Sequence, residues 1–251
     1  MADGAVCAHY KPRALARGYT GAMPARELPE VLILAAGRGK RLRPLTDATP
    51  KALLPLGAGT LIGRHLARLH EQGFSDVVIN LAWLGEQIRG ALGDGGDFGL
   101  RIRYSEEPPG ALGTGGGIVR ALDLLRGREF LVINADIVTD YDYAALRIPE
   151  NCAMQLVLAP NPPAHPHGDF GIRDGKLVMP AEDAPALTYT GIGRFKRDAF
   201  ADCAPGRFPL IPVLQRAIAG GTAGAETHRG RWRDAGTPAE LEEARREIAR
   251  E

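Results

Sequence analysis

The sequence has few cysteines, no surplus of charge and no long hydrophobic run. Its 251 residues include three cysteines, which are too far apart for a zinc motif or a disulfide framework. Lysine and arginine number 31 against 30 acidic residues, and this balance argues against nucleic acid as a ligand. No apolar run approaches the roughly 20 residues that cross a membrane. The sequence therefore predicts a cytoplasmic protein without a membrane or nucleic-acid partner.

The first 29 residues differ from the rest of the chain. They contain lysine and arginine but lack the apolar segment of a signal peptide. We expect a disordered leader over 1–29, or an upstream start codon with Met23 as the functional start. The remainder is long enough to bury a substantial core, which predicts one domain over 30–251.

Strand and helix patterns alternate up to about residue 150. This alternation predicts the α/β class, with a mostly parallel central sheet between helices in a Rossmann-like three-layer αβα arrangement. The expected strands are 31–34, 76–80, 100–104 and 129–134, and the expected helices are 61–69, 87–92 and 118–125.

The pattern changes beyond residue 150. Short strands separated by turns rich in Pro, Gly and Asp predict a small β-rich region of hairpins that covers one side of a site. Two helices are expected after it, and Thr237 and Pro238 suit the N-cap and first position of the second. The expected strands are 154–158, 170–173, 176–178 and 187–190, and the expected helices are 210–219 and 238–251.

A glycine-rich, basic loop follows the first strand. Gly37 and Gly39 allow the backbone to turn so that N–H groups can face an anion. Four cations surround them, which suits a triphosphate. These cations are Lys40, Arg41, Arg43 and Lys51.

Two familiar phosphate-binding loops do not fit this segment. A dinucleotide fingerprint needs a third glycine, and Leu42 occupies its position. A Walker loop needs Ser or Thr after Gly-Lys, and Arg41 stands there instead. The residues therefore exclude both familiar loops, and the loop alone does not name the reaction.

The loop resembles the opening motif of the sugar-1-phosphate nucleotidyltransferases, Leu-x-Gly-Gly-x-Gly-x-Arg-Leu-x-Pro-Leu-Thr followed by Pro-Lys. Ala36 replaces the first glycine of the pair. The resemblance implies an enzyme that joins a nucleoside triphosphate to a sugar 1-phosphate, with a nucleotide half over about 30–150 and a sugar half over 151–251. The matching residues are Gly37, Gly39, Arg41, Leu42, Pro44, Leu45, Thr46, Pro50 and Lys51.

Two aspartates are candidate ligands of Mg²⁺. Asp136 follows a predicted strand at the edge where open α/β sheets bind ligands, and Asp234 lies in a segment that resembles the family's Trp-x-Asp-x-Gly-Thr. Taken alone, Asp136 would more often serve a turn at the end of a strand, and Asp234 would be an ordinary residue before a helix. The resemblance implies that both hold the metal, that Lys51 contacts the α-phosphate and that Arg41 grips the β- and γ-phosphates.

The resemblance also implies contacts with the nucleotide and the sugar. Without it, a solvent-facing role would be open for Arg41 and Lys51, and a purely steric role for the glycines that open a helix at 113–117. The implied nucleotide contacts are Ala36, Gly37, Gly39, Lys40, Arg41, Lys51, Gly113 and Thr114, and the implied catalytic residues are Arg41, Lys51, Asp136 and Asp234.

Segments 78–88, 134–142 and 161–170 resemble the branch of this family that acts on N-acetylmuramate α-1-phosphate and UTP in peptidoglycan recycling. The resemblance implies that Asn134 and Asp169 hold the sugar. His165 and His167 lie among prolines, so we expect them to serve turn packing, and we expect turn or capping roles for Asp140 and Asp142.

Some alternatives stay open. The chain has Gly-Thr-Gly-Gly-Gly at 113–117 where that branch has Glu-Thr-Gly-Gly-Gly. The Leu-Gly-Thr sequence at 112–114 is closer to the motif of guanylyltransferases. Mannose-1-phosphate guanylyltransferase, or another member of the family, is therefore the first alternative. A non-catalytic regulatory domain that binds nucleotide sugars is the second. We expect a monomer or a small homo-oligomer.

Overall fold

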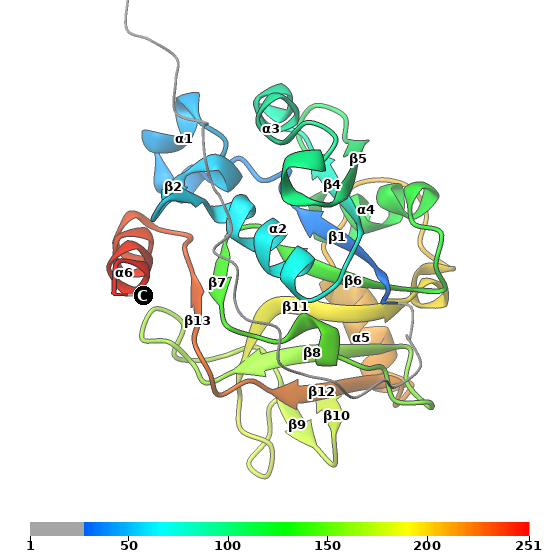
Figure 1. Ribbon diagram of the computed structural model, residues 1–251. Coiled ribbons are helices and arrows are strands. Elements are labelled where there is room, and N and C mark those ends of the chain that lie inside the picture. The colour runs from blue at the N-terminus through cyan, green and yellow to red at the C-terminus, as the bar shows by residue number, and fades with distance from the viewer. Residues whose placement is uncertain (1–27, 251) are drawn as a thin grey trace, which may run out of the picture.

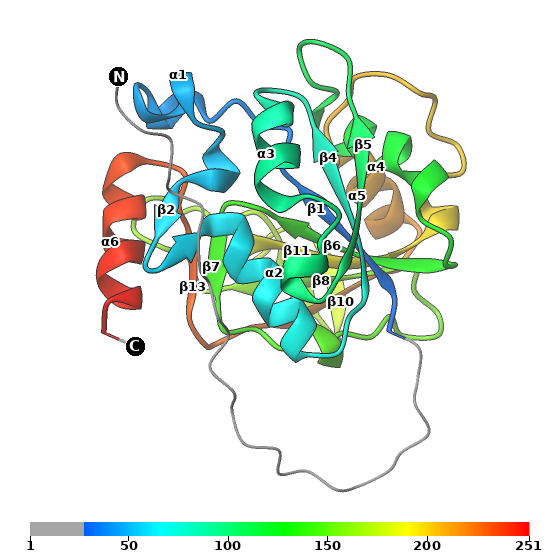
Figure 2. The same cartoon turned by 45° about the horizontal axis from the view of Figure 1, so that its top comes forward.

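The computed structural model describes residues 28–250, which form three layers (Figure 1). Apart from residues 28 and 29, the leader expected over 1–29 lies outside the described residues. Helices α2 (Leu61–Glu71) and α3 (Gly85–Leu92) cover one face of a large sheet. Helices α4 (Gly113–Ala121) and α5 (Ile211–Ala219) cover the other face, as Figure 2 also shows. The expected three-layer α/β fold is confirmed.

Within residues 28–250, nine strands form the central sheet: β1 (Glu30–Leu34), β4 (Asp76–Leu81), β5 (Arg101–Glu106), β6 (Glu129–Asn134), β8 (Met154–Ala159), β9 (Gly171–Arg173), β10 (Lys176–Val178), β11 (Thr188–Lys196) and β12 (Ala223–Thr227). Their order is β5-β4-β1-β6-β11-β8-β12-β10-β9. Strands β11 and β10 run against the direction of the others. The sheet is therefore mixed but mostly parallel in strand direction.

The strands are apolar because helices cover both of their faces. In β1, Val31 and Ile33 join the buried cluster beneath α2 and α3, whereas Leu32 joins the cluster beneath α4 and α5. Successive side chains of a strand point to opposite faces, so a strand buried on both sides is an uninterrupted apolar run. The run from 31 to 34 therefore predicted a central strand correctly.

The second half of the chain differs from the expected hairpins. Strands β8 and β11 lie inside the central sheet, while β9 and β10 form a hairpin at its edge. Strand β11 extends to Lys196, well past the predicted end at residue 190, because it lies between β6 and β8 and most of its residues are buried. The glycine-rich run also forms the first turns of α4 instead of preceding the helix.

A smaller unit sits beside the main sheet. Strand β7 (Ile137–Thr139) pairs with β13 (Trp232–Asp234), and β2 (Pro55–Leu56) pairs with β3 (Gly59–Thr60). Helix α6 (Pro238–Ile248) packs against β13 and β2 over a third apolar cluster, at one side of the molecule in Figures 1 and 2. The Thr237 hydroxyl accepts the N–H of Glu240, which confirms the predicted N-cap.

Short helical segments complete the described chain, and none of its helices is long and apolar enough to span a membrane. The short segments are α1 (Leu45–Ala48) and the 3-10 turns Lys40–Leu42, Lys51–Leu53, Gly96–Phe98, Leu122–Leu124, Tyr143–Ala145 and Arg197–Phe200.

Candidate active site

The two predicted metal ligands come together through the β7–β13 ladder. Asp136 lies between β6 and β7, and Asp234 is the last residue of β13. Asp234 is the register partner of Ile137, and the Ala235 N–H donates to the Asp136 carbonyl oxygen at 2.8 Å. Backbone pairing therefore holds the two aspartates side by side although they are far apart in the sequence.

Two cations face this pair of carboxylates. The buried Lys51 ammonium forms an ion pair with Asp136 and lies 3.9 Å from Asp234 Oδ1. Arg41 Nη2 lies 3.5 Å from Asp234 Oδ2. Burial, and then the neighbouring Asp136 carboxylate, raise the pKa of Asp234, and the two cations partly oppose this shift. Two carboxylates held close enough to repel each other favour a cation between them.

Glycines allow the loops to approach this closely. Gly39 adopts φ +66°, and a Cβ there would lie 2.9 Å from Thr46 Cγ2 and 3.2 Å from Lys51 Cβ. A Cβ at Gly236 would lie 2.5 Å from Arg41 Nη2. Position 39, with its left-handed backbone, therefore favours glycine, whereas a side chain at 236 would crowd the flexible end of Arg41.

A cavity of about 420 Å³ opens beside the carboxylates. The lining includes Arg41, Asn134, Asp136, Asp169 and Asp234, so the predicted metal and sugar residues are brought to one place. Several other residues that line the cavity were not predicted as site residues. Two of them, Trp232 and Thr237, belong to the Trp-x-Asp-x-Gly-Thr segment, and the others belong to no motif. These unpredicted residues include Thr188, Tyr189, Thr190, Trp232, Thr237 and Glu240.

The start of β11 contacts both predicted sugar residues. The Tyr189 N–H donates to Asp169 Oδ2 at 2.8 Å. Gly191 has φ +79°, and a Cβ there would lie 2.6 Å from Asn134 Nδ2. The β-bulge that follows Tyr189 therefore makes room for the Asn134 side chain at the cavity wall.

A hydrogen-bonded bridge connects the opening loop to the start of α4. Asn80 Oδ1 accepts the N–H groups of Ala35 and Ala36 at 2.6 and 3.2 Å, and its amide donates to Glu107 at 2.7 Å. The other Glu107 oxygen accepts the Leu112 N–H at 2.6 Å. The Ala36 N–H is thus engaged by Asn80, and its contact with a nucleotide stays a prediction.

Several predicted nucleotide contacts lie outside the cavity. Gly113 begins α4, where a Cβ would lie 2.8 Å from the Phe208 carbonyl oxygen, and Gly37 has open space around it. Nucleotide contacts of these residues stay predictions. Lys51 does not line the cavity either, but its ion pairs bring it to the carboxylates. The other predicted nucleotide contacts that do not line the cavity are Ala36, Gly37, Gly39, Lys40, Gly113 and Thr114.

Of the two acidic residues near Asp136, Asp142 has the expected capping role, whereas Asp140 pairs with a histidine. Asp142 accepts the Ala144 N–H at the start of a 3-10 turn, and Asp140 lies 2.9 Å from His228 Nε2. Within residues 28–250 no cluster of three or more His, Cys, Asp or Glu side chains is arranged to hold a metal.

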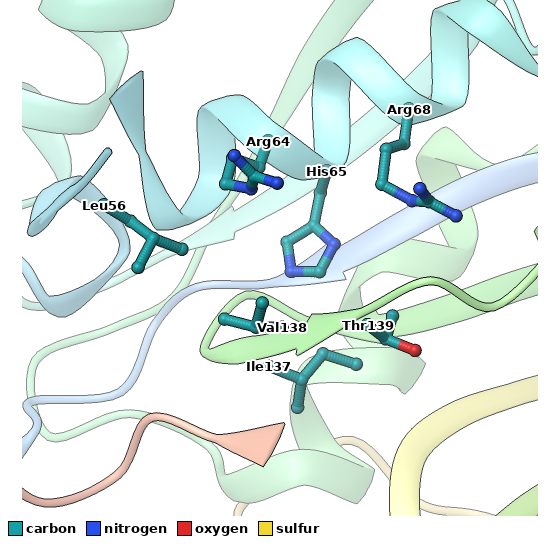
Figure 3. Close-up of a pocket in the computed structure, with 7 residues that line it drawn as sticks. All are labelled: Leu56, Arg64, His65, Arg68, Ile137, Val138 and Thr139. Atoms are coloured by element: carbon teal, nitrogen blue, oxygen red, sulfur yellow. The ribbon is translucent and has the colours of Figure 1, made fainter. Parts of the chain in front are cut away.

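A buried histidine supports the segment that follows Asp136. His65 on α2 points toward β7 (Figure 3), and its Nδ1 lies 3.0 Å from the Tyr143 hydroxyl. The cavity beside it is only about 10 Å³, about the size of one water. Burial lowers the pKa of His65 to about 4. This pocket is therefore part of the core and not a ligand site.

Acid should destabilise the fold through His65. The unfolded side chain titrates near 6.5 and the folded one near 4, so between these values the unfolded state binds more protons. Lowering the pH from about 7.5 to about 5 should cost about 2 kcal/mol of unfolding free energy through this group. Urea unfolding of wild type and His65→Gln at both pH values measures the difference. Equal losses in the two proteins would contradict this assignment.

Comparison with known proteins identifies the family. Residues 30–172 match the nucleotidyl transferase family model. The chain is 45% identical over 222 residues to N-acetylmuramate alpha-1-phosphate uridylyltransferase of Neisseria meningitidis serogroup B, with 86% of this chain and 96% of that protein covered. Identity to the protein of that name from Caulobacter vibrioides is 33%, with 82% and 91% covered.

A solved structure shows the same fold. A putative glucose-1-phosphate thymidylyltransferase from Bacillus anthracis, in complex with a sucrose, superposes with a TM-score of 0.75 at 21% identity, with 87% of this chain and 95% of that chain covered. The family match, the relatives of nearly equal length and the fold agree with the resemblance of the opening loop. The chain therefore belongs to the nucleotidyl transferase family.

Proposed function

We propose that this enzyme transfers a uridylyl group from UTP to N-acetylmuramate α-1-phosphate, giving UDP-N-acetylmuramate and pyrophosphate in cytoplasmic peptidoglycan recycling. The observation that carries the proposal is the cluster of Asp136, Asp234, Lys51 and Arg41 at one cavity. The choice of sugar and base rests on the two relatives that match over most of their length.

The donor set fits Mg²⁺. This ion is commonly held by one or two carboxylates, with substrate phosphates and water completing its shell. Asp136 and Asp234 supply two carboxylates that burial and mutual repulsion predispose to bind a cation. When bound, Mg²⁺ would neutralise negative charge that develops on the α-phosphate and the departing pyrophosphate.

The chain's own residues bind and align two polyanions. Lys51 suits a single α-phosphate oxygen, whereas the planar guanidinium of Arg41 suits paired oxygens of the β- and γ-phosphates. A phosphate oxygen of the sugar attacks the α-phosphorus, a new P–O bond forms, and the bond to pyrophosphate breaks. No nucleophilic side chain is needed, so positioning and charge neutralisation supply the catalysis.

The two halves of the chain would divide the substrates between them. The nucleotide half, about 30–150, contains the Asn80 to Glu107 bridge that ties the opening loop to the start of α4, and we place the base and ribose near Gly113 and Thr114. The sugar half, 151–251, contributes Asp169, which with Asn134 would hydrogen-bond the sugar.

Pyrophosphate release across a panel of nucleoside triphosphates and sugar 1-phosphates tests the proposal. We expect UTP with N-acetylmuramate α-1-phosphate to give a kcat/KM at least about 100-fold above the other pairs, since a hydrogen-bonding site rejects mismatched partners strongly. Turnover of GTP with mannose 1-phosphate and of no other pair would instead support a guanylyltransferase, which the Leu-Gly-Thr motif at 112–114 favours. Tight binding of nucleotide sugars without turnover would indicate the regulatory alternative.

A further inference from the structure

The charges around the cavity are unevenly distributed. Among the described residues, two lining side chains can carry positive charge, and one of them, Arg41, lies beside Asp234 at the metal end. His165 is the other, and it lies on the loop that follows β8, next to Asp169 at the sugar end. The lining carboxylates are Asp136, Asp169, Asp234 and Glu240. A negatively charged group on the sugar would therefore meet mostly repulsion unless a cation faced it.

The His165 ring is oriented by Asp169. His165 Nε2 lies 3.1 Å from Asp169 Oδ1, and the second Asp169 oxygen accepts the Tyr189 N–H. An ionised carboxylate only accepts hydrogen bonds, so Nε2 is the donor in this pair. In the protonated ring Nδ1 carries a second N–H group, which a substrate carboxylate could accept.

The loop that carries His165 is braced. The Asn161 amide donates to the carbonyl oxygens of Pro166 and Ala186 at 3.1 and 3.0 Å, and its own oxygen accepts the Thr188 hydroxyl at 2.8 Å. His165 therefore occupies a fixed position, although its side chain is 46% exposed. Turn packing, the expected role, does not account for an exposed imidazole at the wall of the cavity.

We propose that His165, oriented by Asp169, binds a carboxylate on the sugar substrate and so selects an acidic sugar. This inference rests on the proposed function, because N-acetylmuramate differs from N-acetylglucosamine by a lactyl ether that ends in a carboxylate. A charge-assisted hydrogen bond from the ring would offset the repulsion of the surrounding carboxylates. His165 thus determines specificity and takes no part in the transfer step.

Product binding in the presence of Mg²⁺ tests this role. Dissociation constants for UDP-N-acetylmuramate and UDP-N-acetylglucosamine are measured by calorimetry on wild type and His165→Gln. We expect the substitution to weaken UDP-N-acetylmuramate about tenfold and UDP-N-acetylglucosamine less than about twofold, since the second ligand lacks the carboxylate. The matched control is His167→Gln, which removes an exposed histidine outside the cavity lining and should change neither constant.

The outcomes separate this inference from the proposed function. Equal weakening of both ligands would mean that His165 only positions Asp169, and unchanged binding of both would mean that it contacts neither; each result overturns the inference. Wild type that binds neither UDP-sugar would refute the proposed function itself. Thermal unfolding of the variants shows whether the loop around Asn161 remains intact.

Discussion

Replacing Asp136 by Asn should lower kcat by at least about 1000-fold while the protein stays folded. The substitution keeps the size of the side chain but removes one of the two charges facing Lys51. Loss of one electrostatic contact to a transition state typically costs 100- to 1000-fold, and here a metal carboxylate is lost as well. Steady-state pyrophosphate release at saturating substrates measures the effect.

The control for this substitution lies a few residues further along the chain. Asp140 pairs with His228 and does not line the cavity, so Asp140→Asn should retain activity within about threefold of wild type. Circular dichroism and thermal unfolding establish that both variants fold. If the activity of Asp136→Asn stays within tenfold of wild type, the assignment of Asp136 as a metal ligand is wrong.

Replacing Lys51 by Met should lower kcat/KM by about 100- to 1000-fold, the range for one lost electrostatic contact in a transition state. Lys51 is the cation buried against both carboxylates, with 11% of its side chain exposed. The same substitution leaves Asp136 and Asp234 facing each other without this cation. Their mutual repulsion should make the variant less stable without metal.

Metal binding provides a second measurement on the Lys51 variant. Two carboxylates without the ammonium should gain more from a divalent cation, so Mg²⁺ should raise the Tm of Lys51→Met more than that of wild type. The matched control is Lys196→Met, at the end of β11 and outside the cavity lining, which should respond to Mg²⁺ as wild type does. An equal Tm response of Lys51→Met and wild type would contradict the arrangement of charges.

The fold was largely predictable because the first half of the chain has strong local signals. The run at 129–134 was predicted as a strand and is β6, and the helical spacing that starts at Leu61 marks α2. Strand β6 buries its apolar side chains beneath the helices, and α2 buries its apolar side chains against the sheet. The spacing of apolar residues in each element therefore indicates its burial directly. Such elements can be predicted without knowing which distant segments they contact.

Strand β11 shows why the second half was harder. Its prediction ended at residue 190 because Gly191 and Gly193 are typical of a turn. In the structure both glycines lie within the strand: a Cβ at Gly191 would meet Asn134, and one at Gly193 would lie 2.8 Å from Leu156 Cδ2. The need for glycine at these positions comes from side chains of neighbouring strands, and the local sequence does not indicate it.

The candidate site was likewise predictable only where the sequence carries a local motif. Asp136 and Asp234 were identified by resemblance, but the three-residue strands β7 and β13 that join them are too short for a periodic signal. His165 was expected to serve turn packing, and its place at the cavity wall depends on Asn161 and on β11. Tertiary contacts therefore decide which polar residues line the cavity.

The most direct test of the proposed site is a crystal structure with UDP-N-acetylmuramate and Mn²⁺ in place of Mg²⁺, because anomalous scattering locates the metal independently of the protein atoms. The account predicts a metal ion bound by carboxylate oxygens of both Asp136 and Asp234 and by a phosphate oxygen of the nucleotide. A metal that contacts neither aspartate, or a nucleotide whose phosphates lie away from Lys51, would contradict it.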